Sequence, residues 1–159
     1  MRVYHTSDTV IAHPDVLHSR DALDFGKGFY VTLIREQAVK YGRRFTIRGQ
    51  QAVLNTYELD DKWRCEHIKC FQTYDGEWLD FIVANRKLMP VIPYDAVEGG
   101  IANDKIFRTL DLYLAGEIGR DEALKRLKYE KPNHQICILS QELIDKYLTF
   151  ISSEEITNG

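Results

Sequence analysis

The chain has 159 residues, of which 44% are hydrophobic and 11% aromatic, which is enough to bury one sizeable core and too few for two ordinary domains. A formal net charge of -3 excludes the broad positive surface with which proteins wrap nucleic acid or lie on anionic membranes. The sequence begins without a secretory signal pattern and has no stretch long enough to span a bilayer, so we expect a cytoplasmic protein with no membrane contact.

The first half of the sequence predicts short strands around one helix. The expected elements are a strand at Val3 to His5, a strand at Phe29 to Thr32, a helix at Arg35 to Phe45 and a strand at Gln51 to Leu59. A polar loop from Asp8 to Asp24 follows the opening strand. In the helix, Ala38, Tyr41 and Phe45 recur at three- and four-residue spacing, so we expect them to share one face.

The second half predicts more helix, without a regular alternation of strands and helices. The expected elements are helices at Glu77 to Leu88, from Asn103 or Asp104 to Gly116 and at Asp121 to Leu127, strands at Tyr94 to Glu98, His134 to Leu139 and Tyr147 to Ile151, and a helical turn at Gln141 to Asp145. This order favours an α+β fold over a doubly wound one. We expect a single domain over residues 1–152 and a short polar tail over 153–159.

Cysteines and basic residues give only weak signals. Cys65, Cys70 and Cys137 are an odd number without repeated spacing, which argues against a disulfide framework or a four-ligand zinc site. Cys65, His67 and Cys70 lack a second ligand pair, so we expect no metal. Two basic groups offer local contacts to nucleic acid, although solvated helix faces show the same pattern. They are Arg43, Arg44 and Arg48, and Lys125, Arg126, Lys128 and Lys131.

The segment FGKGFYVT, from Phe25 to Thr32, has the residue types of a ligand site. Gly26 and Gly28 let a backbone approach a ligand closely, and the aromatic residues offer stacking surface. A phosphate loop would need a third glycine and an immediate helix, whereas a strand follows here. A hairpin or bulge relieved by glycine is the structural alternative.

Three separate segments resemble the poly(ADP-ribose) polymerase branch of the ADP-ribosyltransferases. FGKGFYVTLIREQAVKY, from Phe25 to Tyr41, resembles its signature without a gap; Tyr4 to Thr6 resembles its opening strand, and NHQICILSQELIDKYLTFI its closing segment. The middle, from about Phe45 to Lys131, shows no similarity at residue level. The whole chain resembles a small uncharacterised prokaryotic family grouped with these transferases. The resemblance implies two small, packed, mostly antiparallel sheets with flanking helices.

The same resemblance implies that NAD is the substrate, and it assigns roles to individual residues. His5 would donate a hydrogen bond to a ribose hydroxyl, the backbone of Thr6 would pair with the carboxamide, and Tyr30 and Tyr41 would sandwich the nicotinamide. The other positions carried over as NAD-binding are Tyr4, Gly26, Lys27 and Gly28. Such a site works by clamping the dinucleotide while positive charge builds on the ribose.

The third active-site residue departs from the family pattern. Where the family typically has a glutamate, this sequence offers His134 or Gln135. Strand alternation favours Gln135, because Ile136 and Ile138 would then occupy the opposite face. A glutamine cannot act as a carboxylate base, so we expect transfer of single units and no polymer. His5, Tyr30 and Gln135 are therefore the expected catalytic residues.

Two further positions depart from the pattern, and other residues are auxiliary candidates. Ala38 replaces a serine that would bind the nicotinamide amide, and Thr6 replaces a glycine, so that its Cβ would crowd the pocket. The candidates to hold the acceptor or supply a carboxylate are Glu98, Asn103, Asp104 and His134. Glu98 as a surface charge at a strand end, and Asp104 as a helix cap, are the structural alternatives.

These features predict a mono-ADP-ribosyltransferase, either an effector or the toxin of a toxin–antitoxin pair. Its partners would be NAD, an acceptor that is a protein, a nucleic acid or a small molecule, and an antitoxin protein. A catalytically silent module that binds NAD or ADP-ribose is the alternative, because Gln135 and Ala38 remove groups that catalysis uses. A purely structural protein is the third reading.

Overall fold

The computed structural model of the chain describes residues 1–19 and 23–157, except for the side chain of Asp104. Its helical elements are α1 (Arg35–Tyr41), α2 (Arg43–Thr46), η1 (Asp61–Cys65, a 3-10 helix), α3 (Gly76–Arg86), α4 (Asp104–Leu114), α5 (Arg120–Leu127) and α6 (Gln141–Tyr147). Its strands are β1 (Arg2–Ser7), β2 (Phe29–Val31), β3 (Val53–Leu59), β4 (Ile68–Cys70), β5 (Ala96–Gly99), β6 (Gln135–Ile138) and β7 (Leu148–Glu155).

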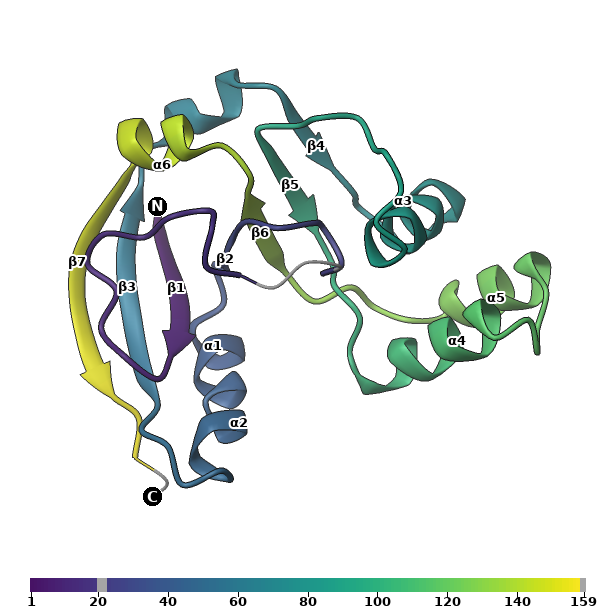
Figure 1. Cartoon of the computed structure of the whole chain (residues 1–159), viewed down its shortest axis with the longest axis horizontal. Helices are drawn as coiled ribbons and strands as arrows, with labels where there is room; N and C mark the ends of the chain where they lie inside the picture. Colours follow the sequence, from purple (N-terminus) through teal and green to yellow (C-terminus); the bar gives the residue numbers. More distant parts are fainter. Residues whose placement is uncertain (20–22, 158–159) are drawn as a thin grey trace.

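The strands form two sheets, mostly antiparallel, in an α+β arrangement (Figure 1). One sheet has the order β1-β3-β7 and the other the order β2-β6-β5-β4. The pairing of β4 with β5 is parallel, and the other strand pairs are antiparallel. The expected α+β class with two mostly antiparallel sheets is therefore confirmed.

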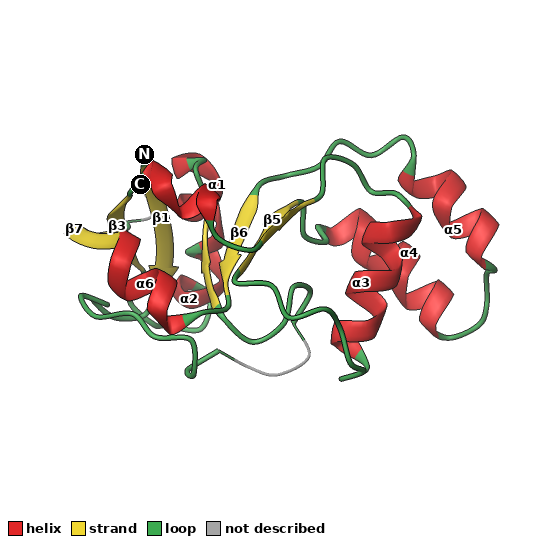
Figure 2. Cartoon of the chain, turned by 90° about the horizontal axis from the view of Figure 1, so that it is seen from above, coloured by secondary structure: helices red, strands yellow, loops and turns green. Residues whose placement is uncertain are grey.

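The four-stranded sheet is covered on both faces. Its helix face, defined by Tyr30, Val97 and Cys137, packs against α3, α4 and α5. Its sheet face, defined by Val31, Ile136 and Ile138, packs against the three-stranded sheet, η1 and α6. Figure 2 shows α3, α4 and α5 together at one end and the three-stranded sheet with α1, α2 and α6 at the other, with β5 and β6 between them.

The structure corrects several predicted boundaries. The helix expected at Arg35 to Phe45 is divided at Gly42, where a Cβ would lie 3.1 Å from Ile156 and 3.3 Å from Ala52. Ala38 is buried, whereas Tyr41 is 44% exposed and its ring contacts that of Phe45 at 6.0 Å. The expected face is therefore only partly in the core. The last strand continues through Glu155, which pairs with Val53, so part of the expected tail is in the sheet.

Two elements were not predicted. The strand β4 has only three residues, too few to show alternation, and η1 begins where Asp60 accepts a hydrogen bond from the backbone N–H of Lys62 at 2.9 Å. The strand β5 starts at Ala96 and not at Tyr94, whose N–H instead bonds to the carbonyl of Ile92. None of the described helices is both long and apolar enough to cross a membrane.

Candidate functional site

The two sheets meet at one backbone bridge and then diverge. The N–H of Tyr4 donates to the carbonyl of Thr32 at 2.9 Å, and the N–H of Thr32 donates to the carbonyl of Tyr4 at 3.0 Å. In a continuous antiparallel ladder, the next hydrogen-bonded pair would be Thr6 with Tyr30. The imidazole of His5 takes that place instead, with Nδ1 2.6 Å from the carbonyl oxygen of Tyr30. The pairing of β1 with β2 therefore ends directly after the bridge, and we call this interrupted edge the gap.

Backbone polar groups face this gap. Strand residues direct their N–H and C=O alternately to the two sides, so those of Thr6 point the same way as those of Tyr4, away from β3. By the same alternation, the N–H of Tyr30 points toward β1, as that of Thr32 does. The gap thus presents two donors and one acceptor that have no strand opposite them.

His5 is held in one orientation and one tautomer. Its ring stacks on Phe29 with centroids 4.4 Å apart, and its Nδ1 must carry the proton that the carbonyl of Tyr30 accepts. Burial lowers the pKa of His5, and the hydrogen bond to Tyr30 opposes that shift only in part, so the ring is neutral near pH 7. The free lone pair is then on Nε2. We expected His5 to donate to a ribose hydroxyl, but in this tautomer Nε2 can only accept a hydrogen bond.

The side chain of Tyr30 lies on the helix face and is bound to the glycine loop. Its hydroxyl donates to the carbonyl of Gly26 at 2.6 Å and accepts from the N–H of Phe25 at 3.1 Å. Burial raises the pKa of Tyr30 far above its ordinary value, so the hydroxyl stays protonated and keeps both bonds. The ring position is therefore fixed by the segment that precedes β2.

The two glycines of that segment are required by its own packing. Gly26 has a φ of 98°, which favours glycine. A Cβ on Gly28 would lie 2.5 Å from the carbonyl oxygen of Ile138 and 2.7 Å from the sulfur of Cys137. Lys27 is exposed between them. The glycines thus let the loop lie close against β6. The sequence had predicted that they let the backbone approach a ligand.

Thr6 and Ala38, the two departures from the family pattern, contact each other. The hydroxyl of Thr6 donates to the carbonyl oxygen of Ala38 in α1 at 2.5 Å. The Thr6 side chain is therefore committed to α1, while its backbone groups face the gap. Figure 1 shows α1 beside β1, where this bond joins them.

Tyr41 is at the end of α1, and its ring is turned toward α2. The ring of Phe45 meets it edge-on at 6.0 Å, and the guanidinium of Arg44 lies 4.9 Å from its centroid. Among the described residues, no direct ring contact joins Tyr41 to Tyr30. The predicted pairing of the two tyrosines on opposite sides of a nicotinamide stays a prediction.

Strand alternation places Gln135 on the same face as Tyr30. Ile136 and Ile138 belong to the core under the sheet face, whereas Cys137 belongs to the core under the helix face. The predicted alternation of β6 is confirmed, and it puts Gln135 with Cys137. Gln135 is partly exposed and lies opposite Gly99 of β5.

His134 and Glu98 belong to a polar network that the sequence did not reveal. His134 Nδ1 accepts the N–H of Leu33 at 3.2 Å, so its ring proton is on Nε2, 3.0 Å from Glu98 Oε2. Arg64 contacts both carboxylate oxygens of Glu98, at 3.1 and 3.4 Å. The side chain of Glu98 is only 10% exposed, and alternation along β5 puts it on the sheet face, opposite to Gln135.

The network holds Glu98 ionised. Burial raises the pKa of Glu98, but hydrogen bonds from His134 and Arg64 outweigh it and keep the pKa below its ordinary value of 4.5. A carboxylate whose pKa is lowered by folding stabilises the fold fully above the unfolded value, and this stabilisation is lost as pH falls through the folded value.

Replacement of Glu98 by glutamine should therefore remove an acid-sensitive part of the stability. We expect the wild type to lose stability more steeply than Glu98→Gln between about pH 5 and pH 3, measured by urea unfolding at each pH. Glu142→Gln, at an exposed carboxylate paired with Lys146, is the control and should follow the wild type. Parallel wild-type and Glu98→Gln curves would contradict the assignment.

The remaining auxiliary candidates lie in the loop between β5 and α4. Asn103 is the N-cap of α4, and its side chain accepts from the N–H of Ile106 at 3.1 Å. Asp104 is the first residue of that helix, and its side chain lies outside the described part of the chain.

A buried ion pair joins this loop to the glycine segment, and no pattern in the sequence predicted it. Asp24 binds Arg86 of α3 at 2.7 Å, with side chains 13% and 15% exposed. The second oxygen of Asp24 accepts the N–H of Ala102 at 2.9 Å. The Asp24 carboxylate therefore joins three parts of the fold. They are the segment before β2, the helix α3, and the loop before α4.

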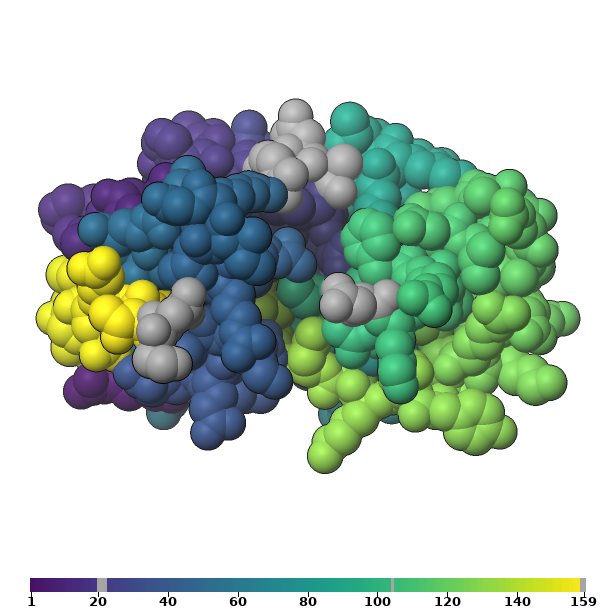
Figure 3. Space-filling view, turned by 90° about the horizontal axis from the view of Figure 1, so that it is seen from below, coloured from purple at the N-terminus to yellow at the C-terminus, as the bar shows by residue number. Residues whose placement is uncertain are grey.

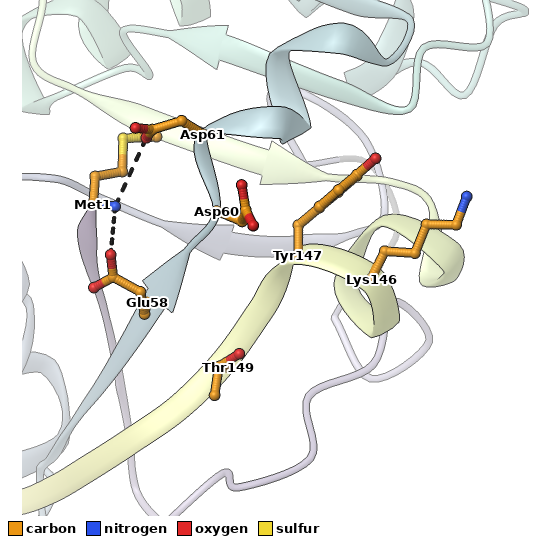
Figure 4. A pocket seen from close by; sticks show the side chains of 7 residues that line it. All are labelled: Met1, Glu58, Asp60, Asp61, Lys146, Tyr147 and Thr149. Carbon is orange, nitrogen blue, oxygen red and sulfur yellow. Dashed lines mark hydrogen bonds and ion pairs between the residues drawn. The ribbon is translucent and has the colours of Figure 1, made fainter.

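A hollow elsewhere on the surface is unsuited to a dinucleotide. It has a volume of about 350 Å³ and lies at the other end of β1 from the gap. Figure 4 shows the Met1 amine between Glu58 and Asp61, with Asp60 nearby. The hollow is lined by three carboxylates against two cations, the Met1 amine and Lys146, and this net negative charge would repel a pyrophosphate. The described His, Cys, Asp and Glu residues form no group of three or more that could hold a metal ion.

The sequence model of a family described as "Protein of unknown function (DUF3990)" matches residues 1–150. Comparisons with curated proteins and with solved structures returned no match. The family match thus covers the gap, the glycine loop and Gln135 together.

Proposed function

The chain belongs to the DUF3990 family, and from the site of this family member we propose that it transfers single ADP-ribose units from NAD to an acceptor. The observation that carries the proposal is the divergence of β1 and β2 after the bridge of Tyr4 with Thr32. It leaves the backbone groups of Thr6 without a paired strand beside His5 and Tyr30, the residues to which the resemblance assigns the nicotinamide end of NAD.

The chemistry of the gap fits this substrate. The Thr6 N–H can donate to the carboxamide oxygen and the Thr6 carbonyl can accept from the carboxamide nitrogen. Nε2 of His5 can accept from a ribose hydroxyl, because Nδ1 is already bound to Tyr30. In the reaction, the bond between the ribose C1′ and nicotinamide breaks and nicotinamide leaves with the electron pair. The acceptor nucleophile bonds to C1′, and its proton passes to solvent.

Gln135 limits the rate of this reaction. It shares the helix face with Tyr30 and can hydrogen-bond a ribose hydroxyl, but it offers no negative charge to offset the charge that builds on the ribose. We expect Gln135→Glu to raise the rate of nicotinamide release about tenfold, equivalent to about 1.4 kcal/mol of added charge stabilisation. The rate is measured by chromatography of released nicotinamide.

An exposed glutamine provides the control for this gain. Gln50→Glu adds the same charge outside the site and should leave the rate unchanged. If Gln135→Glu has no effect or lowers the rate, Gln135 does not occupy the third active-site position.

The proposal is tested with NAD labelled on its adenine-linked phosphate, incubated with the protein and a bacterial lysate. We expect label on a macromolecule together with stoichiometric free nicotinamide. Absence of label on protein, nucleic acid and small molecules, without any NAD hydrolysis, would contradict the proposal.

A silent module that binds NAD or ADP-ribose is the second candidate, and two observations favour it. Gln135 supplies no carboxylate, and Ala38 stands where the family has a serine hydroxyl for the nicotinamide amide. Calorimetry separates the two candidates: heat of binding with intact NAD after long incubation supports the module, and released nicotinamide excludes it. The antitoxin partner stays a prediction from the sequence.

A further inference from the structure

The α1–α2 surface, defined by Lys40, Arg43, Arg44 and Arg48, is a cluster of exposed cations. None of these four side chains forms an ion pair within the described part of the chain. Between residues 35 and 50 the sole acidic residue is Glu36, and Arg35 is neutralised by Glu154 of β7. In a chain whose net charge is -3, this surface is a local exception.

The second basic group of the sequence, around α5, is interrupted by acidic residues. Around α5, basic residues alternate with Asp121, Glu122 and Glu130, and Arg126 is paired with Glu122 at 3.0 Å. Such alternation is typical of a solvated helix. The two groups looked equivalent in the sequence, and the structure separates them.

The α1–α2 surface adjoins the gap between β1 and β2. α1 packs on β1, and the bond from Thr6 to Ala38 joins the helix to the strand whose backbone faces the gap. In Figure 3 the α1–α2 segment, in blue, and α4, in green, stand on the two sides of a hollow in the surface. A polyanion held on the α1–α2 surface would therefore lie at the edge of the proposed NAD site.

We propose that the α1–α2 surface holds single-stranded nucleic acid as the acceptor, an inference that rests on the proposed transferase function. The four cations span about 12 Å of helix, the reach of two or three phosphates of an extended strand. A base must leave its stack to reach C1′ of a bound NAD, and an unpaired strand permits this without the cost of opening a duplex. The net charge of -3 gives no sequence basis for a broad positive surface that would grip a duplex.

The test measures binding of a fluorescein-labelled 20-nucleotide single strand, as DNA and as RNA, at a series of salt concentrations and without NAD. With two or three phosphate contacts, the logarithm of the binding constant should fall with the logarithm of salt at a slope of about -2. In the variant Lys40→Gln/Arg43→Gln/Arg48→Gln the slope should shrink to about -1, with affinity at low salt reduced at least tenfold. Lys125→Gln/Lys128→Gln/Lys131→Gln removes the same charge around α5 and should bind as the wild type does.

Several results would overturn the inference. They are no binding by the wild type at low salt, equal weakening in both triple variants, tighter binding of a duplex than of the single strand, and equal competition by polyglutamate, which would point to an acidic protein acceptor. NAD turnover without strand binding contradicts this inference alone. Strand binding without any turnover contradicts the proposed function.

Discussion

Replacement of His5 by alanine should lower the rate of nicotinamide release from NAD by about 100-fold. The imidazole is held by Phe29 and by the carbonyl of Tyr30, so that Nε2 is presented as a preorganised acceptor. Its loss removes the contact to the ribose hydroxyl and also lets the Tyr30 carbonyl relax toward the gap. Release of nicotinamide is followed at saturating and at low NAD, so that changes in kcat and KM are separated.

The control is His18→Ala, since His18 is exposed and, within the described residues, its hydrogen bonds go to nearby groups of Asp15. It should keep the wild-type rate. A His5→Ala protein that unfolds at the same urea concentration as the wild type and still releases nicotinamide at the wild-type rate would contradict the role of His5.

Replacement of Asp24 by alanine should lower the free energy of unfolding by about 3–5 kcal/mol, because it leaves the buried Arg86 guanidinium without its partner. The same change frees the N–H of Ala102 and releases the loop before α4 from the glycine segment. Urea unfolding gives the stability. Since that loop lies beside the site, NAD affinity should fall as well.

Two further variants make the cause of this loss identifiable. Asp24→Ala/Arg86→Met removes both charges and should regain part of the stability. Asp80→Ala breaks the pair with Arg120, which is exposed, and should cost less than about 1 kcal/mol. Equal effects of Asp24→Ala and Asp80→Ala would contradict the buried pair.

The strands and helices with clear periodicity could be predicted from the sequence, and short elements could not. Alternation along β6 correctly placed Cys137 on the opposite face from Ile136 and Ile138, because successive side chains of a strand point to opposite faces. The three residues of β4 are in a sheet because β5 supplies their partners, which no local pattern shows. At Gly42 the N–H bonds to the carbonyl of Val39, three residues back, although φ and ψ stay helical. The contacts with Ala52 and Ile156 there come from distant parts of the chain, which no local pattern shows.

Several residues of the candidate site were predicted from the sequence, but the contacts that position them were not. His5, Thr6 and Tyr30 were identified through a resemblance, and the structure brings them to one gap. The tautomer of His5 depends on the carbonyl of Tyr30, 25 residues away. Arg64 and Asp24 were missed because each acts through a partner distant in the sequence, and a lone charged residue in a sequence is indistinguishable from surface charge.

The divergence of β1 and β2 has a consequence for substrate selectivity. The carboxamide oxygen and one of its two N–H groups point to the same side, as the C=O and N–H of a single strand residue do. The nicotinamide amide would therefore dock on Thr6 as a residue of a paired strand does. The deamidated analogue of NAD carries a carboxylate there, which has no proton to give to the Thr6 carbonyl and would be repelled by it. We therefore expect nicotinic acid adenine dinucleotide to compete poorly with NAD for binding. The unpaired edge of β1 has groups that bind an amide and not a carboxylate.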